Sequence, residues 1–338
     1  MFSLCVSGNI TFMENIIHGA NPENLYRAFN IPVPERIIDF STNTNILQWP
    51  KISIDIERLA SRYPDPDCTR LRELIAEREN ISPSRILFTN GTNEAVFLLS
   101  RLFTHSTAIL QPNYSEYSRA FTHAHNVFSL DDAGKFSAFI LSNPNNPTGK
   151  YIADLSRVIE SCPDTVFIVD EAYIDFLIHG EPERLCGYGN VIILRSLTKI
   201  FHLSGARIGY VIADENIITA LKALQPTWSV NAFAQELAFM FMNDDEFCTR
   251  TRNFYRENTP AFMESLRASG FEVAESDVHY FMIQIEDDAE VIKHLLRNGI
   301  AVRHTRNFAG IGGKYIRAAT RRPDENETFT ESMKKIRS

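Results

Sequence analysis

The 338-residue chain lacks the features that mark secreted, zinc-binding and membrane-spanning proteins. Its five cysteines are scattered, odd in number and without a close pair, so neither a disulfide framework nor a zinc site is indicated. The opening MFSLCVSGNITFMENII has no basic region and an interrupted apolar run, unlike a secretory signal. The most apolar later stretch, VNAFAQELAFMFM, is interrupted by Gln235 and Glu236 and is too short to span a bilayer. These absences predict a cytoplasmic protein.

Positive charge is also scarce. The chain has 34 Lys and Arg against 42 Asp and Glu, which gives a formal net charge of -8. Nucleic acids and anionic membranes both require a basic protein surface that replaces their counterions, so we expect neither as a partner. An anionic ligand must therefore be held by a local group of cations.

Short apolar runs alternate with helical patterns along the first two thirds of the chain. The runs are RILFT (85–89), AFILS (138–142), VFIVD (166–170), VIILRS (191–196) and RIGYVIA (207–213). This alternation predicts an α/β domain with a mostly parallel central sheet between layers of helices.

From about Ile217 the alternating pattern gives way to longer helical patterns. After Gly270 a unit of strands and one helix follows, in the order FEVAES, YFMIQIE, AEVIKHLLRNG, IAVRHT and YIRAAT. It predicts a smaller α+β domain. We expect residues 1–50 to contribute to this small domain and to the active site, residues 51–243 to form the large domain, and residues 244–338 to form the small C-terminal domain.

Polar clusters follow the predicted strands, where open α/β sheets bind their ligands. In FTNGTNEA, a turn at Gly91 leads into a helix whose free N–H groups suit a phosphate, although an ordinary capped helix explains the same pattern. LSNPNNPTGK places three asparagine amides on a tight turn. VFIVDEAY buries Asp170 at a strand end, where it requires a partner; a structural ion pair is the alternative.

The fourth cluster, RSLTKIFHLSGAR, combines Ser196, Thr198, Lys199 and Arg207 just after a predicted buried strand. A lysine at a helix start is by itself ordinary. Together, however, the four clusters describe a ligand with a phosphate, a basic ring nitrogen and an aldehyde that a lysine can capture. Pyridoxal 5'-phosphate has these three groups.

The motifs NPNNPTG, VDEAY, RSLTK and GARIGY resemble those of fold-type I pyridoxal-phosphate enzymes of the aspartate aminotransferase superfamily. Three other stretches, HGANPENLYRAFNIPVPERIIDFSTNTN, PTWSVNAFA and GIAVRHTRNFAGIGGKYIRAATRRPDENE, are similar to the threonine-phosphate decarboxylases of cobalamin biosynthesis. The chain departs from that pattern at Ala20, where those enzymes have glycine, at the variable positions Thr42 and Thr44, and in a shortened segment at 128–137.

The resemblance implies a role for each matching residue. Lys199 would carry the cofactor covalently, Asp170 would pair with the ring nitrogen, Asn146 and Tyr173 would bond the 3' oxygen, and Tyr114 would stack on the ring. The cofactor phosphate would be held by Thr92, Asn93, Ser196, Thr198 and Arg207. Tyr63 would reach the cofactor phosphate of a neighbouring subunit, which implies a homodimer with shared sites.

The resemblance also implies substrate contacts. Arg317 matches the arginine that grips the substrate's α-carboxylate, and Arg303, His18 and Asn43 are the candidates for its phosphate. The pair His123 and His125 lacks a third ligand, so no metal is expected.

The expected activity is decarboxylation of an O-phosphorylated hydroxy amino acid, either phosphothreonine or phosphoserine. Two alternatives stay open at this point. Histidinol-phosphate aminotransferases share the same cofactor motifs, and a pyridoxal-phosphate-binding regulator without turnover is a different class of protein.

Overall fold

The computed structural model describes residues 19–337, which divide into two compact units. The large unit holds Thr44–Asn145 and Tyr151–Asn253. The small unit holds the described residues up to Asn43, together with Asn146–Lys150 and the chain from Phe254 onward. The boundary at Phe254 falls inside the long helix α11 (Asp245–Ala268). The domain boundaries expected after residues 50 and 243 remain a prediction.

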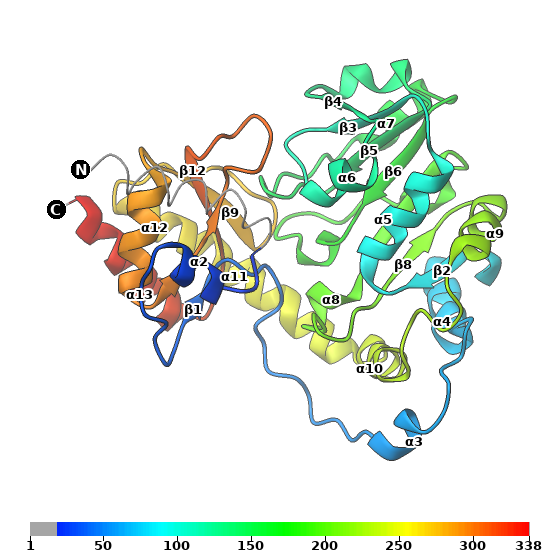
Figure 1. Cartoon of the computed structure of the whole chain (residues 1–338), viewed down its shortest axis with the longest axis horizontal. Coiled ribbons are helices and arrows are strands. Elements are labelled where there is room, and N and C mark those ends of the chain that lie inside the picture. The colour runs from blue at the N-terminus through cyan, green and yellow to red at the C-terminus, as the bar shows by residue number, and fades with distance from the viewer. Residues whose placement is uncertain (1–18, 338) are drawn as a thin grey trace. The chain divides into compact units, whose positions relative to one another are not determined.

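A sheet of seven strands organises the described part of the large unit (Figure 1). Its order is β2-β8-β7-β6-β5-β3-β4. The strand β8 runs antiparallel to both its neighbours, and the other pairs are parallel. The strands are β2 (Ile86–Thr89), β3 (Thr107–Leu110), β4 (His125–Val127), β5 (Ala138–Ser142), β6 (Val166–Asp170), β7 (Val191–Ser196) and β8 (Gly209–Ile212).

Helices connect and cover these strands. The α-helices of the large unit are α3 (Ile56–Ala60), α4 (Thr69–Glu79), α5 (Gly91–Leu102), α6 (Ser115–Ala120), α7 (Leu155–Ser161), α8 (Leu197–Ile200), α9 (Glu215–Leu224) and α10 (Ala232–Met242). Short 3-10 helices lie at Pro83–Arg85, Leu130–Lys135, Ile174–Phe176 and Leu185–Gly187.

One face of the large sheet packs against α5, α6 and α9. Buried residues from these helices, among them Leu99, Tyr117 and Leu221, form one cluster with strand residues that include Ile168 and Leu194. Because side chains alternate along a strand, Asp170 and Ser196 share the face of Ile168 and Leu194. The packing of α5 and α6 therefore decides what surrounds the polar ends of β6 and β7.

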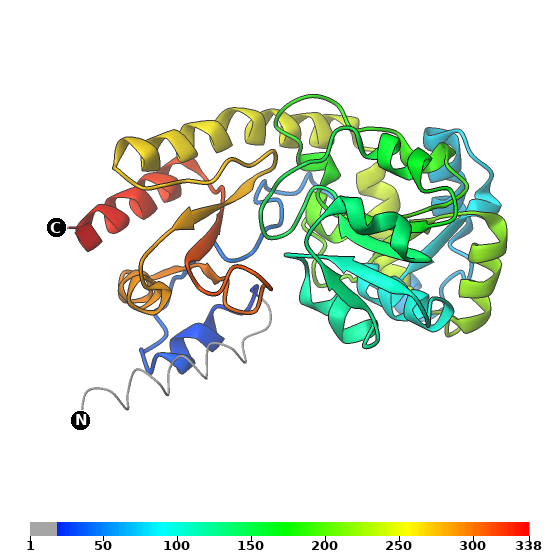
Figure 2. The same cartoon turned by 90° about the horizontal axis from the view of Figure 1, so that it is seen from above.

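Within its described residues, the small unit has two short sheets and three helices besides α11. Figure 2 shows these elements from above. The strands β11 (Arg303–His304), β12 (Tyr315–Ala319) and β9 (Tyr280–Gln284) form an antiparallel sheet, and β1 (Ile38–Asp39) pairs in parallel with β10 (Ile300–Ala301). The helices are α2 (Glu23–Ala28), α12 (Asp288–Arg297) and α13 (Pro323–Arg337).

The N-terminal segment helps to build the core of the small unit. The ring of Phe40 lies 4.7 Å from that of Phe329 and 5.9 Å from that of Phe262, between α13 and α11. Leu25 and Tyr26 of α2 belong to the same buried cluster. A chain lacking this segment would expose these aromatic rings to water, so the segment is part of the folded unit.

Two predicted strands of the small unit differ from the structure. The run IAVRHT divides into β10 and β11, which belong to different sheets, and the run FEVAES forms no regular strand. Only Val273 forms a bridge, with Ile283. Ser276 directs its hydroxyl to the carbonyl of Tyr280 at 2.6 Å, and Asp277 donates its N–H to Gly149, so the backbone turns away from the sheet there. Among the helices of residues 19–337, none combines the length and the apolar character needed to cross a membrane.

Candidate active site

The start of α5 forms a cradle for an anion. Gly91 has φ +73°, and a Cβ added there would lie 2.6 Å from the guanidinium of Arg207. Arg207 itself has φ 60°, a left-handed conformation that is uncommon outside glycine. The guanidinium therefore lies against the first residue of a twelve-residue helix, where free N–H groups and the helix dipole already favour negative charge.

The end of β7 contributes hydroxyl groups to the same place. Ser196 is the last residue of β7 and Thr198 lies in α8; both are buried, and their hydroxyl oxygens are 2.8 Å apart. Ser196 pairs in register with Gly209 of β8, and a Cβ on Gly209 would lie 3.0 Å from the backbone nitrogen of Thr92. The hydroxyl pair and the start of α5 are thus neighbours.

Lys199 follows Thr198 on α8, a helix of a single turn. Its Nζ lies 5.7 Å from the centre of the Tyr173 ring. Tyr173 is buried just beyond β6. A cation within about 6 Å of the centre of an aromatic ring is attracted to the ring face, so this contact helps to orient the Lys199 amine.

A buried carboxylate lies at the end of β6. Asp170 accepts the backbone N–H of Ala172 on Oδ1 at 2.9 Å and the phenol of Tyr117 on Oδ2. Burial raises the pKa of Asp170, while the hydrogen bonds from Tyr117 and Ala172 and the charge of Lys199 act in the opposite direction. The ionised form is therefore costly but has specific support.

Two tyrosines from one helical segment border this carboxylate. Tyr114 precedes α6 and donates its phenol to Asn93 at 3.2 Å, and its ring meets that of Tyr117 edge to face at 5.7 Å. Burial raises the pKa of Tyr114 to about 12. Both phenols therefore act as neutral hydrogen-bond donors at ordinary pH.

An ion pair lies on the opposite side of the same strands. Glu171 follows Asp170 directly and pairs with Arg195, the residue before Ser196, at 2.5 Å. Both side chains are mostly buried. Burial raises the pKa of Glu171, and the guanidinium of Arg195 opposes that shift. The sequence analysis left a structural ion pair open for Asp170. In the structure it is the next residue, Glu171, that forms such a pair.

A second polar cluster lies within the small unit, around Arg317 of β12. Its guanidinium donates to the carbonyl of Ser41 at 2.9 Å, to Oδ1 of Asn43 at 3.3 Å and to Oδ1 of Asn146. The carboxylate of Asp39 accepts the N–H and hydroxyl of Ser41, at 2.8 and 2.6 Å. The N-terminal segment therefore holds one of the acceptors of Arg317 in place.

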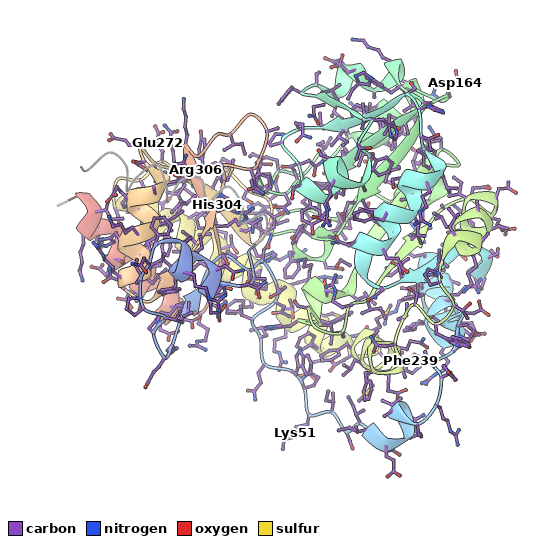
Figure 3. The ribbon with its side chains drawn as sticks, viewed as in Figure 1. Lys51, Asp164, Phe239, Glu272, His304 and Arg306 are labelled. Atoms are coloured by element: carbon purple, nitrogen blue, oxygen red, sulfur yellow. The ribbon has the colours of Figure 1, made fainter. Side chains whose placement is uncertain are left out.

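Arg303 of β11 lies beside Arg317, because the two residues are partners in the strand register. Both are almost fully buried, at 3% and 4% exposed. Arg303 donates to Asn307 at 2.7 Å and lies 5.4 Å from the centre of the Phe308 ring, so the loop after β11 orients it. The same loop is anchored by Arg306, which is labelled in Figure 3. Arg306 binds both carboxylate oxygens of the buried Asp288.

The predicted site residues fall into two sets. The large unit holds Thr92, Asn93, Tyr114, Asp170, Tyr173, Ser196, Thr198, Lys199 and Arg207, and the small unit holds Asn43, Asn146, Arg303 and Arg317. Tyr63 is 79% exposed and stacks on Trp228, with ring centres 4.5 Å apart. His18 lies outside the described residues. The departure Ala20 has φ 74°, a conformation that would suit the glycine of the resembling motif.

Sequence reasoning missed Tyr117 and Arg195. Tyr117 reads as one more core aromatic, and only its place three residues after Tyr114, on the same helical face, is a signal. Arg195 was hidden inside an apolar run. Within residues 19–337, no group of three or more His, Cys, Asp or Glu side chains is arranged to hold a metal ion.

Comparisons with known proteins point to one family. The chain is 28% identical to the threonine-phosphate decarboxylase of Salmonella typhimurium, over 95% of this chain and 97% of that protein. It is 29% identical to a histidinol-phosphate aminotransferase of Caldicellulosiruptor saccharolyticus, over 82% of this chain and 84% of that protein. The crystal structure of L-threonine-O-3-phosphate decarboxylase from Porphyromonas gingivalis matches with a TM-score of 0.78 and 27% identity, over 89% of this chain and 99% of that one.

These matches confirm the predicted fold-type I α/β architecture, with its mostly parallel central sheet between helices. The family model for aminotransferases of class I and II matches residues 128–331, which include Asp170, Lys199, Arg207 and Arg317. The chain belongs to the aminotransferase class I and II family.

Proposed function

We propose that this chain is a pyridoxal-phosphate-dependent decarboxylase of an O-phosphorylated hydroxy amino acid, phosphothreonine or phosphoserine. The product would be aminopropanol phosphate or ethanolamine phosphate, the amine that links the nucleotide loop in cobamides. Enzymes of the aminotransferase class I and II family depend on this cofactor.

The residues of the large unit fit the cofactor. The space over Gly91, which a Cβ would fill, places the Arg207 guanidinium at the start of α5, as a phosphate requires. The buried carboxylate of Asp170 suits a protonated ring nitrogen, since an opposite charge would offset its burial. Lys199 would hold the cofactor covalently. The remaining assignments in the large unit are Thr92, Asn93, Ser196 and Thr198 to the phosphate, Tyr114 to the ring face, and Tyr173 to the 3' oxygen. Asn146 of the small unit is also assigned to the 3' oxygen.

The bound cofactor supplies an electron-withdrawing ring that stabilises negative charge on the substrate's Cα. Decarboxylation breaks the bond between Cα and the carboxylate, releases CO2 and leaves Cα to accept a proton. Lys199 is the amine that we assign to deliver this proton. Asp170 would hold the ring nitrogen in its protonated form.

The observation that supports a substrate with two anionic groups is the in-register pair of buried arginines, Arg303 and Arg317. Side chains of directly paired residues lie within about 5.5 Å at Cβ, so two guanidinium groups are presented side by side. A ligand with two anionic groups matches such a pair, because each guanidinium forms two parallel hydrogen bonds with a carboxylate or phosphate. Phosphothreonine and phosphoserine carry both groups. Arg317 would bind the carboxylate, and Arg303 would bind the phosphate together with Asn43 and His18.

Histidinol-phosphate aminotransferase is the second candidate. Its support is the similar identity of the chain to enzymes of that name. Histidinol phosphate has a phosphate but no carboxylate, and the reaction consumes 2-oxoglutarate. The two activities therefore differ in what they release: CO2 from a phosphorylated amino acid, or glutamate from 2-oxoglutarate.

The first experiment supplies the purified, cofactor-loaded protein with phosphothreonine, phosphoserine, or histidinol phosphate plus 2-oxoglutarate. We expect CO2 and an amine phosphate from one or both of the first two substrates. Turnover of histidinol phosphate alone would overturn the decarboxylase proposal. Phosphothreonine and phosphoserine differ by one methyl group, and such a difference changes the free energy that discriminates two substrates by only about 1–3 kcal/mol. Both phosphorylated amino acids therefore belong in the assay.

A second experiment separates the two arginines. We expect Arg303→Gln and Arg317→Gln each to raise KM for the phosphorylated amino acid about 10- to 150-fold, the value of one charge-assisted hydrogen-bonding group. Ethanolamine phosphate lacks the carboxylate, so its inhibition should weaken in Arg303→Gln and stay unchanged in Arg317→Gln. The matched control is Arg157→Gln, since Arg157 is 79% exposed and forms a surface pair with Asp154. Equal loss of inhibition in both variants would contradict the assignment.

A further inference from the structure

The carboxylate of Asp170 is held by two donors of different kinds. The backbone N–H of Ala172 binds Oδ1 at 2.9 Å, and this contact depends only on the turn after β6. The phenol of Tyr117 binds Oδ2, and this contact depends on a side chain 53 residues away in sequence. The first contact fixes where the carboxylate is, and the second can also tune its charge.

The burial of Tyr117 determines which partner donates in its hydrogen bond to Asp170. It is 1% exposed and belongs to the cluster between α6 and the sheet. Burial, together with the nearby charge of Asp170, raises the pKa of Tyr117 well above its ordinary value of 10.0. The phenol is therefore the donor and the carboxylate the acceptor in this hydrogen bond.

Other groups also face this carboxylate. Lys199 of α8 contributes a positive charge, and the phenols of Tyr114 and Tyr173 are close enough to interact electrostatically with Asp170 or Tyr117. Glu171 projects to the other face of the sheet, toward Arg195. Among these groups, Tyr117 is the side chain whose hydrogen bond to the Asp170 carboxylate lowers the cost of its ionised form.

We propose that Tyr117 is a positioning residue that keeps Asp170 ionised and directed at the ring nitrogen of the cofactor, and thereby sets how strongly that ring withdraws electrons. This inference rests on the proposed function. A buried carboxylate that loses one of its donors takes up a proton more readily. A neutral Asp170 would no longer favour a protonated ring nitrogen, so the visible spectrum of the bound cofactor and its affinity would both change.

The test uses the holoenzyme of Tyr117→Phe, which removes only the phenol oxygen. The matched control is Tyr188→Phe, because Tyr188 also donates its phenol to a carboxylate, Glu160, at 2.7 Å, but at the partly exposed surface. Three quantities are measured: the pH midpoint of the cofactor's visible band, the Kd of pyridoxal phosphate, and kcat and KM.

We expect Tyr117→Phe to shift the pH midpoint, to weaken cofactor binding about tenfold, and to lower kcat with little change in KM. Tyr188→Phe should match the wild type in all three. A carbocyclic analogue, with CH in place of the ring nitrogen, separates tuning from simple packing. The wild type and Tyr117→Phe should bind this analogue equally well, because it has no ring N–H that an ionised Asp170 could accept.

Two results would overturn the inference. One is a Tyr117→Phe protein whose spectrum and cofactor Kd equal those of the wild type. The other is an equal loss of affinity for pyridoxal phosphate and for the carbocyclic analogue, which would assign Tyr117 a packing role. If the wild type itself fails to bind pyridoxal phosphate, the proposed function fails instead.

A second variant covers the case in which Tyr117→Phe does not fold. Replacement of Tyr117 by 3-fluorotyrosine keeps the shape of the side chain and makes the phenol a stronger donor. The stronger donor makes Asp170 ionise more readily. The pH midpoint of the cofactor's visible band should therefore move in the direction opposite to its shift in Tyr117→Phe. An unchanged midpoint in the fluorinated protein would refute the inference.

Discussion

The contact between Gly91 and Arg207 offers a sharp test of the anion cradle. In Gly91→Ala, the new Cβ would lie 2.6 Å from the Arg207 guanidinium, and φ +73° is strained for alanine. The strain costs about 1–2 kcal/mol, while the reduced freedom of the unfolded chain returns about 0.4–1 kcal/mol. We therefore expect a net destabilisation of about 1 kcal/mol from the backbone alone.

The clash should act mainly on cofactor binding. The end of an arginine side chain can swing away at little cost to folding, but the phosphate then loses a charge-assisted hydrogen bond. Such a bond contributes about 1.5–3 kcal/mol, which corresponds to a Kd for pyridoxal phosphate that is about 10- to 150-fold higher. The assay is an absorbance or fluorescence titration of the apo protein, combined with thermal unfolding.

Two other glycines separate strain from clash. Gly180 has φ +67° with nothing within 4 Å of an added Cβ, so Gly180→Ala should lose the same stability as Gly91→Ala but keep the wild-type Kd. Gly187 has neither a positive φ nor a neighbour, so Gly187→Ala should match the wild type in both measurements. Equal cofactor affinity in Gly91→Ala and Gly180→Ala would refute the cradle.

Three other predictions concern the cofactor site and the assembly. Lys199→Ala should abolish borohydride-stable attachment of the cofactor, as measured by mass spectrometry; an adduct at another lysine would contradict the assignment. Because burial raises the pKa of Asp170 above its ordinary value of 3.8, the folded apo protein is stabilised as pH falls through that raised pKa. The Tm of the wild type minus that of Asp170→Asn should therefore increase on acidification, and a constant difference between pH 8 and pH 4 would count against it. The protein should sediment as a dimer, and a wild-type monomer would contradict this prediction. The variant Tyr63→Ala should remain a dimer. It should bind pyridoxal phosphate about fivefold to tenfold more weakly, which corresponds to the loss of one hydrogen bond.

The interior strands β5, β6 and β7 of the large sheet were predictable from their own apolar runs, whereas the interior strand β3, which is also largely buried, was missed. The runs predicted at 138–142, 166–170 and 191–196 coincide with β5, β6 and β7, which are buried on both faces and therefore apolar up to their polar last residues. The strand β4 was missed because two of its three residues are exposed at the sheet edge, so His125 and Asn126 give no apolar pattern. The strand β8 runs antiparallel to β2 and β7, a direction that its apolar run at 207–213 does not encode.

Residues at strand ends were also predictable, and residues that support them were not. Asp170 and Ser196 stand out because a polar group directly follows an apolar run. Tyr117 does not stand out, since an aromatic residue on a buried helical face reads as core. Its role depends on the packing of α6 on the sheet, a long-range contact that local patterns do not encode.

The ion pair between Glu171 and Arg195 has a consequence for how reliably the site assembles. A slip of one residue between β6 and β7 would send Ser196 to the wrong side of the sheet and would separate these two buried charges. An unpaired buried charge raises the free energy of the folded chain by several kcal/mol. Misaligned pairings of the two strands are therefore less stable than the correct one. The ion pair on one side of the sheet thus helps to fix the register of β6 and β7. That register in turn places Asp170 and Ser196 together on the other side.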